Sequence, residues 1–365
     1  MILGSIYSPT DKALFDAINQ KSVTAHDLRS LFLKHGIIIS TSTPRHTLAL
    51  HFARLMHDYE DFESLARMFD TVQRRERLTS IRVKSTATNE DVEAAAHELV
   101  AKLKEASDAA SITVNGNGSI QVLVRYRKLH FNKSDFRQVE NKEAIVTLER
   151  EGDVLVVRGP ENEKVAEICS ELISNIESKS QGKVDIDRIN LEQFRDSKLR
   201  TSFFRYLIDG VPGYKRYDVT DVYLFNPKKK APKLEEDGES DYGKSEESDL
   251  GIHISRASLK GGQVLESTEI KELLDKGFYI SKIIWRVRDP NFDADIAEFE
   301  AQFSEPETCT NFSYLVKGYY EYQQDGKFSE RRKQFGTAED RELGKLVEVS
   351  ARAAVQRVST LGGTS

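Results

Sequence analysis

Cysteine is scarce in this chain, and its scarcity excludes two kinds of small stabilised protein. Only Cys169 and Cys309 occur among 365 residues, and neither belongs to a CxxC pair. A disulfide framework and a zinc ribbon both need more thiols at closer spacing. We therefore expect both cysteines to be small buried hydrophobes.

Long apolar runs are also lacking. No stretch approaches the roughly 20 apolar residues that cross a bilayer. The segment Met1–Ser5 has neither the basic start nor the apolar core of a signal peptide. These absences predict an intracellular, cytoplasmic protein without a membrane partner. At 39% hydrophobic residues, the chain has enough apolar side chains to bury the cores of two or three domains.

Catalytic motifs are missing as well, since the sequence has no HExxH, GxGxxG, phosphate-loop or GxSxG pattern. Five of the eight histidines lie between His26 and His57, but the spacings are unsuitable for a metal. His46 and His51 are five residues apart and His51 and His57 six, whereas a helical pair needs four. We predict ordinary surface histidines, no metal, no cofactor and no enzymatic activity. A site assembled from scattered residues remains open.

The formal net charge of -6 is concentrated in one segment. Residues Glu235–Asp249 contain eight acidic residues and one Lys, so the rest of the chain carries +1. The segment from Leu234 to Asp249 is polar and without periodicity, which predicts a disordered loop. A basic run of four lysines precedes it, at Lys228–Lys230 and Lys233. The loop is either a solvated insertion or a screen that folds back on a basic surface.

Two short amphipathic helices stand near the start of the chain. Leu28, Leu31 and Phe32 form one apolar stripe, after which Gly36 ends the helix. Pro44 then opens a second helix, predicted to run to His57, with its stripe on Leu48, Phe52 and Leu55. Four basic residues lie off the stripes and are expected to face solvent: Arg29, Lys34, Arg45 and Arg54.

This pattern of residues 24–58 resembles the SAP-type helix-extension-helix domain, whose members commonly bind DNA. The likeness rests on Asp27-Leu28-Arg29 and Leu31 before His35-Gly36-Ile37, followed by Thr43, Arg45, Leu48 and Phe52. Thr43-Pro44-Arg45 stands where the family usually has Gly-Lys. The resemblance implies that the basic residues contact DNA phosphates. A small helical bundle without any ligand has the same apolar spacing, and this alternative remains open.

Element order predicts an α+β protein in three parts. Residues 1–78 form a small helical SAP-like module, and residues 79–182 and 183–365 form two units of antiparallel sheet plus helix, the second containing the acidic loop 234–249. Asn115-Gly116-Asn117-Gly118 predicts a hairpin, and Pro160 is expected to open a helix to about Lys179. Ala297, Phe299, Ala301 and Phe303 alternate with polar residues, which indicates a sheet with one wet face.

Basic and aromatic side chains cluster in several places, and they are the candidate nucleic-acid contacts. Arg125 and Arg127 share one strand face and Tyr126 takes the other. A solvated sheet face with its aromatic in the core gives the same pattern. A further basic and aromatic group around Lys198–Tyr217 fits a partner interface equally well. The predicted nucleic-acid-binding residues are Arg29, Lys34, Arg45, Arg54, Arg74, Arg75, Arg77, Arg125, Arg127, Lys128, Lys133 and Arg137.

Two functions follow from these observations. The first is a non-enzymatic protein that binds nucleic acid, DNA in particular, or serves as an adaptor through its basic groups. The second is a protein-interaction subunit of a larger complex, without direct nucleic-acid contact, in which the sheets and the acidic loop meet other proteins.

Overall fold

The computed structural model describes residues 10–20, 23–69, 75–106, 108–116, 118–130, 136, 139–180, 183–227, 255–291 and 293–363. It has an α+β fold with an N-terminal helical region and an antiparallel sheet, as predicted. The chain divides into two compact units. The first unit is Met1–Arg75, Val100–Ile112 and Val122–Ile145, and the second is Glu76–Leu99, Thr113–Gln121 and Val146–Ser365. The boundaries drawn from the sequence at residues 78 and 182 stay predictions.

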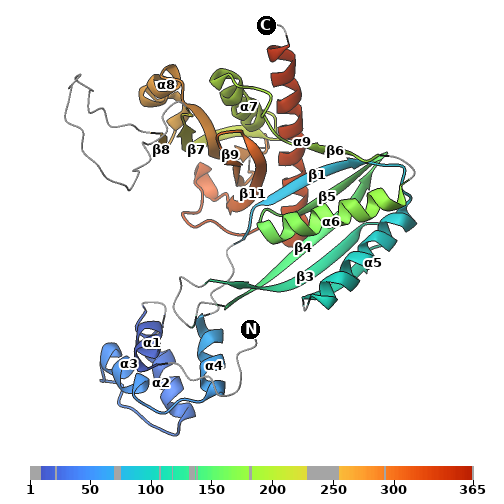
Figure 1. Ribbon diagram of the computed structural model, residues 1–365. Helices are drawn as coiled ribbons and strands as arrows, with labels where there is room; N and C mark the ends of the chain where they lie inside the picture. Colours follow the sequence, from blue (N-terminus) through green and yellow to red (C-terminus); the bar gives the residue numbers. More distant parts are fainter. Residues whose placement is uncertain are drawn as a thin grey trace, which may run out of the picture. The chain divides into compact units, whose positions relative to one another are not determined.

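Four helices open the first unit (Figure 1): α1 (Asp11–Ile18), α2 (Ala25–Lys34), α3 (Arg45–Ala53) and α4 (Tyr59–Phe69). The predicted apolar stripes are confirmed, since Leu28, Phe32 and Leu48 are at most 2% exposed in one common core. Phe136, which lies far along the chain, packs on Phe62 in the same core, with ring centroids 4.9 Å apart.

Local sequence sets both ends of α2. Thr24 caps the start, because its hydroxyl accepts from the Asp27 amide and the Asp27 carboxylate accepts from the Thr24 amide. Hydrogen bonds that the Thr24 hydroxyl and the Thr24 amide donate to the Asp27 carboxylate lower the pKa of Asp27. Gly36 follows the helix with φ of 70°, a conformation that glycine adopts without strain.

The second predicted helix ends earlier than expected. The structure stops α3 at Ala53, whereas the apolar spacing predicted a helix to His57. Arg54 forms a tighter closing bond, with its amide donating to the carbonyl of His51 at 3.2 Å. Residues after Arg54 therefore leave the helical path, and His57 lies in the connection to α4.

The first unit also contains most of a β-ribbon. Strands β2 (Ala109–Val114), β3 (Ile120–Leu129) and β4 (Val139–Glu151) are neighbours in that order. The predicted turn between β2 and β3 is confirmed, because Gly118 has φ of 78° and its amide donates to the carbonyl of Asn115 at 2.9 Å.

The second unit is built on an antiparallel sheet. Its strands run in the order β5-β1-β11-β10-β9-β7-β8, and β6 also pairs with β1. These strands are β1 (Leu78–Lys84), β5 (Val154–Pro160), β6 (Asp185–Arg188), β7 (Lys215–Phe225), β8 (Arg256–Lys260), β9 (Tyr279–Arg288), β10 (Ile296–Glu305) and β11 (Thr310–Tyr320).

Strand β1 is shared between two parts of this sheet. One edge pairs with β5 along its length, from Leu78 opposite Pro160 to Lys84 opposite Val154. The other edge meets β11 at Leu78 opposite Tyr314, and further along it pairs with β6. A short central strand thus joins segments that are more than 200 residues apart in the sequence.

Helices cover the sheet of the second unit: α6 (Glu163–Lys179), α7 (Ser197–Asp209), α8 (Thr268–Asp275) and α9 (Thr337–Gly362). Helix α5 (Asn89–Glu105) is divided between the units. Trp285 is fully buried and packs in one core with Phe204 of α7 and Val347 of α9. Both cysteines are buried as expected, and burial raises the pKa of Cys309 to about 11.

One expected helix start is wrong, and one helix was not expected. Pro160 ends β5, and α6 begins at Glu163, because Asn162 caps it by accepting from the Val165 amide at 2.9 Å. The basic and aromatic group around Lys198–Tyr217 contains α7, which the sequence analysis missed. Phe203 of α7 is fully buried, so this side of the group is core and no partner interface. The acidic loop 234–249 lies outside the described residues.

Candidate functional site

Two of the predicted nucleic-acid-binding arginines hold the helical module together. Arg45 donates hydrogen bonds to the backbone carbonyls of Val23 at 2.7 Å and Ile18 at 3.3 Å. Arg29 donates to the carbonyl of Thr41 at 2.6 Å. Both side chains are half-buried, so the expectation that they face solvent is wrong. Carbonyls at a helix end lack intrahelical partners, and a guanidinium supplies several donors for them.

The other predicted residues of the helical region have different outcomes. Lys34 and Arg54 are exposed, as predicted, and Arg75 is exposed as well. Arg74, Lys133 and Arg137 lie outside the described residues. The first unit therefore offers scattered cations from its helices, and the described side chains form no continuous basic surface there.

The β3–β4 ribbon carries the remaining predicted residues of the first unit. Arg125, Arg127 and Lys128 are exposed, whereas Tyr126 is 8% exposed on the opposite face, which confirms the predicted separation of charge from aromatic. The Arg125 side chain is 65% exposed and its Nε lies 2.7 Å from Glu143 Oε2. An exposed ion pair of this kind contributes little stability, so Arg125 is available to another anion.

The last predicted residue, Arg77, belongs to the second unit and leads to a larger cluster. Its guanidinium lies 3.5 Å from Glu300 and 3.8 Å from Glu161. Glu300 is one of two buried carboxylates on β10, and Glu298 is the other. We call the surface made by these carboxylates and their cations the charged face, comprising Arg77, Lys282, Arg286, Glu298, Glu300, Lys317 and Arg332.

Each of the two carboxylates accepts hydrogen bonds from cations of the charged face. Glu300 accepts from Lys282 at 2.7 Å and from Lys317 at 3.5 Å. Glu298 accepts from Arg286 at 3.3 Å and from Arg332 at 2.5 Å. Both glutamates are buried, at 4% exposure for Glu298 and 6% for Glu300.

Burial of these glutamates contradicts the expectation of a wet face on β10. The alternation itself is confirmed, because Phe299 and Ala301 lie in the core, while Glu298 and Glu300 lie between them on the other face. The cations come from β9, β11 and the segment after it, and they cover the carboxylates. A buried carboxylate needs such partners, because removing a charge from water is costly.

Aromatic rings lie beside several cations of this surface. The Lys282 ammonium is 5.1 Å from the Tyr223 ring centroid, and the Arg286 guanidinium is 4.3 Å from the Tyr320 ring centroid. Both distances suit cation–π attraction. The charged face therefore combines five cations, two carboxylates and aromatic rings, and it carries a formal charge of +3.

The charged face makes stability depend on pH in a defined direction. Burial alone raises the pKa of Glu300, but the hydrogen bond from Lys282 and the charges of Lys282, Lys317 and Arg77 outweigh it and lower the pKa below its ordinary value. A carboxylate with a lowered folded pKa stabilises the protein above the unfolded pKa, and this stability is lost as pH falls through the folded pKa.

We expect Glu300→Gln to lose less stability than the unchanged protein when the pH falls from 7 to 3. The reason is that glutamine has no proton to take up at this position. Denaturant unfolding at several pH values measures the difference. Identical pH dependence in both proteins would show that Glu300 is not held in its ionised form by the surrounding cations.

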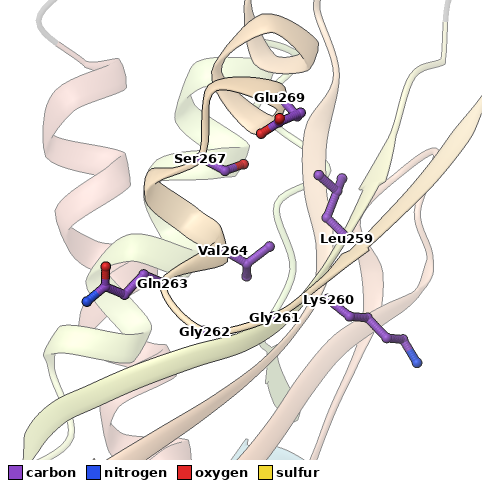
Figure 2. Close-up of a pocket in the computed structure, with 8 residues that line it drawn as sticks. All are labelled: Leu259, Lys260, Gly261, Gly262, Gln263, Val264, Ser267 and Glu269. Carbon is purple, nitrogen blue, oxygen red and sulfur yellow. The ribbon is translucent and has the colours of Figure 1, made fainter.

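A shallow pocket of about 400 Å³ in the second unit lacks comparable chemistry (Figure 2). Leu259 and Val264 contribute apolar lining, and Lys260 and Glu269 bring one charge of each sign. Gly261 and Gly262 form the turn between β8 and the following 3-10 helix. This pocket brings together no convergent set of charges.

Sequence reasoning missed every residue of the charged face except Arg77. The signal was present as alternation in three strands, with Lys282 and Arg286 on β9, Glu298 and Glu300 on β10, and Lys317 on β11. Only the pairing register brings them together, with Arg286 opposite Glu298 and Ile284 opposite Glu300. The register of these neighbouring strands depends on their connections and on core packing, so it was not read from the sequence.

No helix in the described part of the chain has the length and apolar character needed to cross a membrane. No family model matches the chain, and no curated protein matches it either.

Proposed function

We propose that this protein binds nucleic acid, and DNA in particular, through phosphate contacts with little reading of sequence and without catalysis. The observation that carries the proposal is the charged face, where five cations outnumber two carboxylates. Phosphate contacts by Lys and Arg supply most of the affinity in non-specific nucleic-acid binding. Aromatic rings beside the cations, such as Tyr223 and Tyr320, supply stacking surfaces for bases.

The cations of the charged face differ in how closely they approach the carboxylate oxygens. Arg77 and Lys317 have the longest contacts, with no carboxylate oxygen closer than 3.5 Å. Their side chains are 34% and 19% exposed. These two side chains can turn to a phosphate without unpairing a buried glutamate, because Lys282 still holds Glu300 at 2.7 Å.

The exposed β3–β4 ribbon of the first unit supports the same proposal independently. Arg125 has one exposed acidic neighbour, Glu143, whose side chain is 44% exposed. Competition between Glu143 and a phosphate for Arg125 gives two substitutions opposite expected effects. Removing Arg125 removes a phosphate contact, whereas removing Glu143 frees one.

We expect the double variant Arg77→Ala with Lys317→Ala to bind DNA roughly tenfold more weakly, with the salt dependence of log Kd reduced by about 1 per lost phosphate contact. Fluorescence anisotropy with labelled single- and double-stranded DNA and RNA, at low and moderate salt, measures both quantities. In the same titration Arg125→Ala should weaken binding and Glu143→Ala should strengthen it.

The matched control removes two exposed lysines, one in α8 and one directly after it, by Lys271→Ala with Lys276→Ala, and therefore changes the net charge equally. Its affinity should stay close to that of the unchanged protein. Equal weakening in both double variants would mean that only net charge matters. Affinity that is absent, or insensitive to salt, would overturn the proposal.

A second candidate function is that of a protein-interaction subunit. Exposed aliphatic side chains on the ribbon favour it, with Leu129 and Ile145 each 47% exposed and Val139 37% exposed. Aliphatic groups gain more from a protein partner than from phosphates. Persistent absence of salt-sensitive nucleic-acid binding, together with a partner whose binding is lost in Ile145→Asp, would favour this function.

A further inference from the structure

The fold brings together three side chains that the sequence did not associate: His35, His57 and Asp61. His35 is the residue that ends α2, His57 lies in the connection after α3, and Asp61 is in the first turn of α4. One ligand atom from each of the three lies within 4.8 Å of the others. The early end of α3 makes this possible, because it releases His57 from the helical path.

The distances from the carboxylate to the imidazoles suit a bound cation. Asp61 Oδ1 lies 3.3 Å from His35 Nε2, and Asp61 Oδ2 lies 3.4 Å from His57 Nδ1. A tetrahedral ion with bonds of about 2.0–2.1 Å separates its ligands by about 3.4 Å. The imidazole nitrogens lie within 4.8 Å of each other, so side-chain rotation has only a short distance to close around an ion.

Hydrogen bonding fixes which nitrogen of His57 faces the carboxylate as an electron-pair donor. His57 Nε2 lies 2.8 Å from the backbone carbonyl oxygen of Phe52. A carbonyl only accepts, so Nε2 carries the proton and neutral His57 has a lone pair on Nδ1. That lone pair and the Asp61 carboxylate face each other, and both are attracted to a cation placed between them.

This arrangement is the one that metal-bound histidines usually have. A ligating imidazole donates its other N–H to a carbonyl or carboxylate, which orients the ring and raises its basicity. The Phe52 carbonyl serves that role here, and the Phe52 ring packs against both imidazoles, with centroids 4.7 Å from His57 and 5.5 Å from His35. The His57 side chain is only 2% exposed, so it is no surface histidine.

We propose that His35, His57 and Asp61 bind a divalent transition-metal ion of the zinc class. Two imidazole nitrogens and one carboxylate oxygen suit Zn²⁺, and three protein ligands leave one tetrahedral position for water. The ion ties the end of α2 to the start of α4. Metal binding to the folded state alone therefore stabilises the helical module.

The test uses the full chain, stripped with a chelator and then titrated with Zn²⁺. Equilibrium dialysis with elemental analysis should give one Zn²⁺ per chain, and Co²⁺ should give the visible absorption of a tetrahedral site. Zn²⁺ should raise the Tm of the unchanged protein by a few degrees. Asp61→Asn and His35→Ala should weaken Zn²⁺ binding at least about 100-fold.

His51→Gln is the matched control, because His51 is an exposed histidine of the same module on α3. It should bind Zn²⁺ as the unchanged protein does. Circular dichroism of each variant without metal verifies that the helices remain. The proposal is overturned if the unchanged chain binds no stoichiometric Zn²⁺ or if Asp61→Asn binds Zn²⁺ equally well. It is also overturned if the Tm changes with pH but not with added Zn²⁺.

Discussion

Arg158→Met should lower the free energy of unfolding by about 3–5 kcal/mol, the range observed when one partner of a buried ion pair is removed. Arg158 Nε lies 2.8 Å from Glu348 Oε2, and the Glu348 side chain is only 2% exposed. Without Arg158, the cation that stays beside Glu348 among the described residues is Arg352, whose Nε is 3.6 Å away. The substitution therefore leaves a poorly compensated charge in the core of the second unit.

The direction of the Arg158 pKa agrees with this account. Burial alone lowers the pKa of the guanidinium, but the charge of Glu348 and the hydrogen bonds that Arg158 donates to Glu151 and Glu348 outweigh burial and raise this pKa above its ordinary value. The cation is thus stabilised in the folded state by its carboxylates. Glu149, which also contacts Arg158 at 2.9 Å, has further cations in Lys345 and Arg341.

A double variant distinguishes loss of charge pairing from loss of packing. Arg158→Met combined with Glu348→Leu should recover most of the lost stability, because apolar residues of similar volume often replace a buried ion pair without cost. Denaturant unfolding of both single variants and the double variant gives the coupling energy. A loss below about 1 kcal/mol for Arg158→Met would contradict the prediction.

Gly318→Ala is the second substitution with a large expected effect. Gly318 has φ of +136°, where other residues are strained by about 1–3 kcal/mol, and overpacking adds about 1–3 kcal/mol. A Cβ there would collide with the backbone carbonyl oxygen of Lys333. We therefore expect a loss of roughly 3 kcal/mol or more in the free energy of unfolding.

The collision has a local consequence for the charged face. The Lys333 carbonyl accepts from the Tyr319 amide at 2.9 Å, and the Lys333 amide donates back to Tyr319 at 2.8 Å. Arg332, the cation that pairs with Glu298, is the next residue. Gly318→Ala should therefore displace Arg332 as well as destabilise the protein.

Thermal and denaturant unfolding measure the effect of Gly318→Ala, with Gly116→Ala as the matched control. A Cβ added at Gly116 would have no atom within 4 Å, and the backbone there needs no positive φ. Its replacement should therefore change the free energy of unfolding by no more than about 0.5 kcal/mol. Equal stability of the two alanine variants would contradict the prediction. It would show that the backbone at the end of β11 accommodates the added Cβ without a loss in the free energy of unfolding.

The amino-acid sequence by itself determined the local elements. The stripe of Leu28, Leu31 and Phe32, the stop at Gly36 and the alternation around Phe299 each depend on residues a few positions apart. Such patterns follow from the periods of the helix and the strand, so they predicted the α+β class correctly. These local patterns did not determine which polar side chains on those elements are buried or which groups they contact.

Tertiary structure alone decided which charged groups meet. Arg45 turns inward because unpaired carbonyls of α1 lie within its reach, and Glu298 is buried because register places Arg286 opposite it. His35 and Asp61 converge because α2 and α4 pack in one core. These encounters join residues 12 to 27 positions apart, and their pairing is fixed by how the elements pack and by no local pattern.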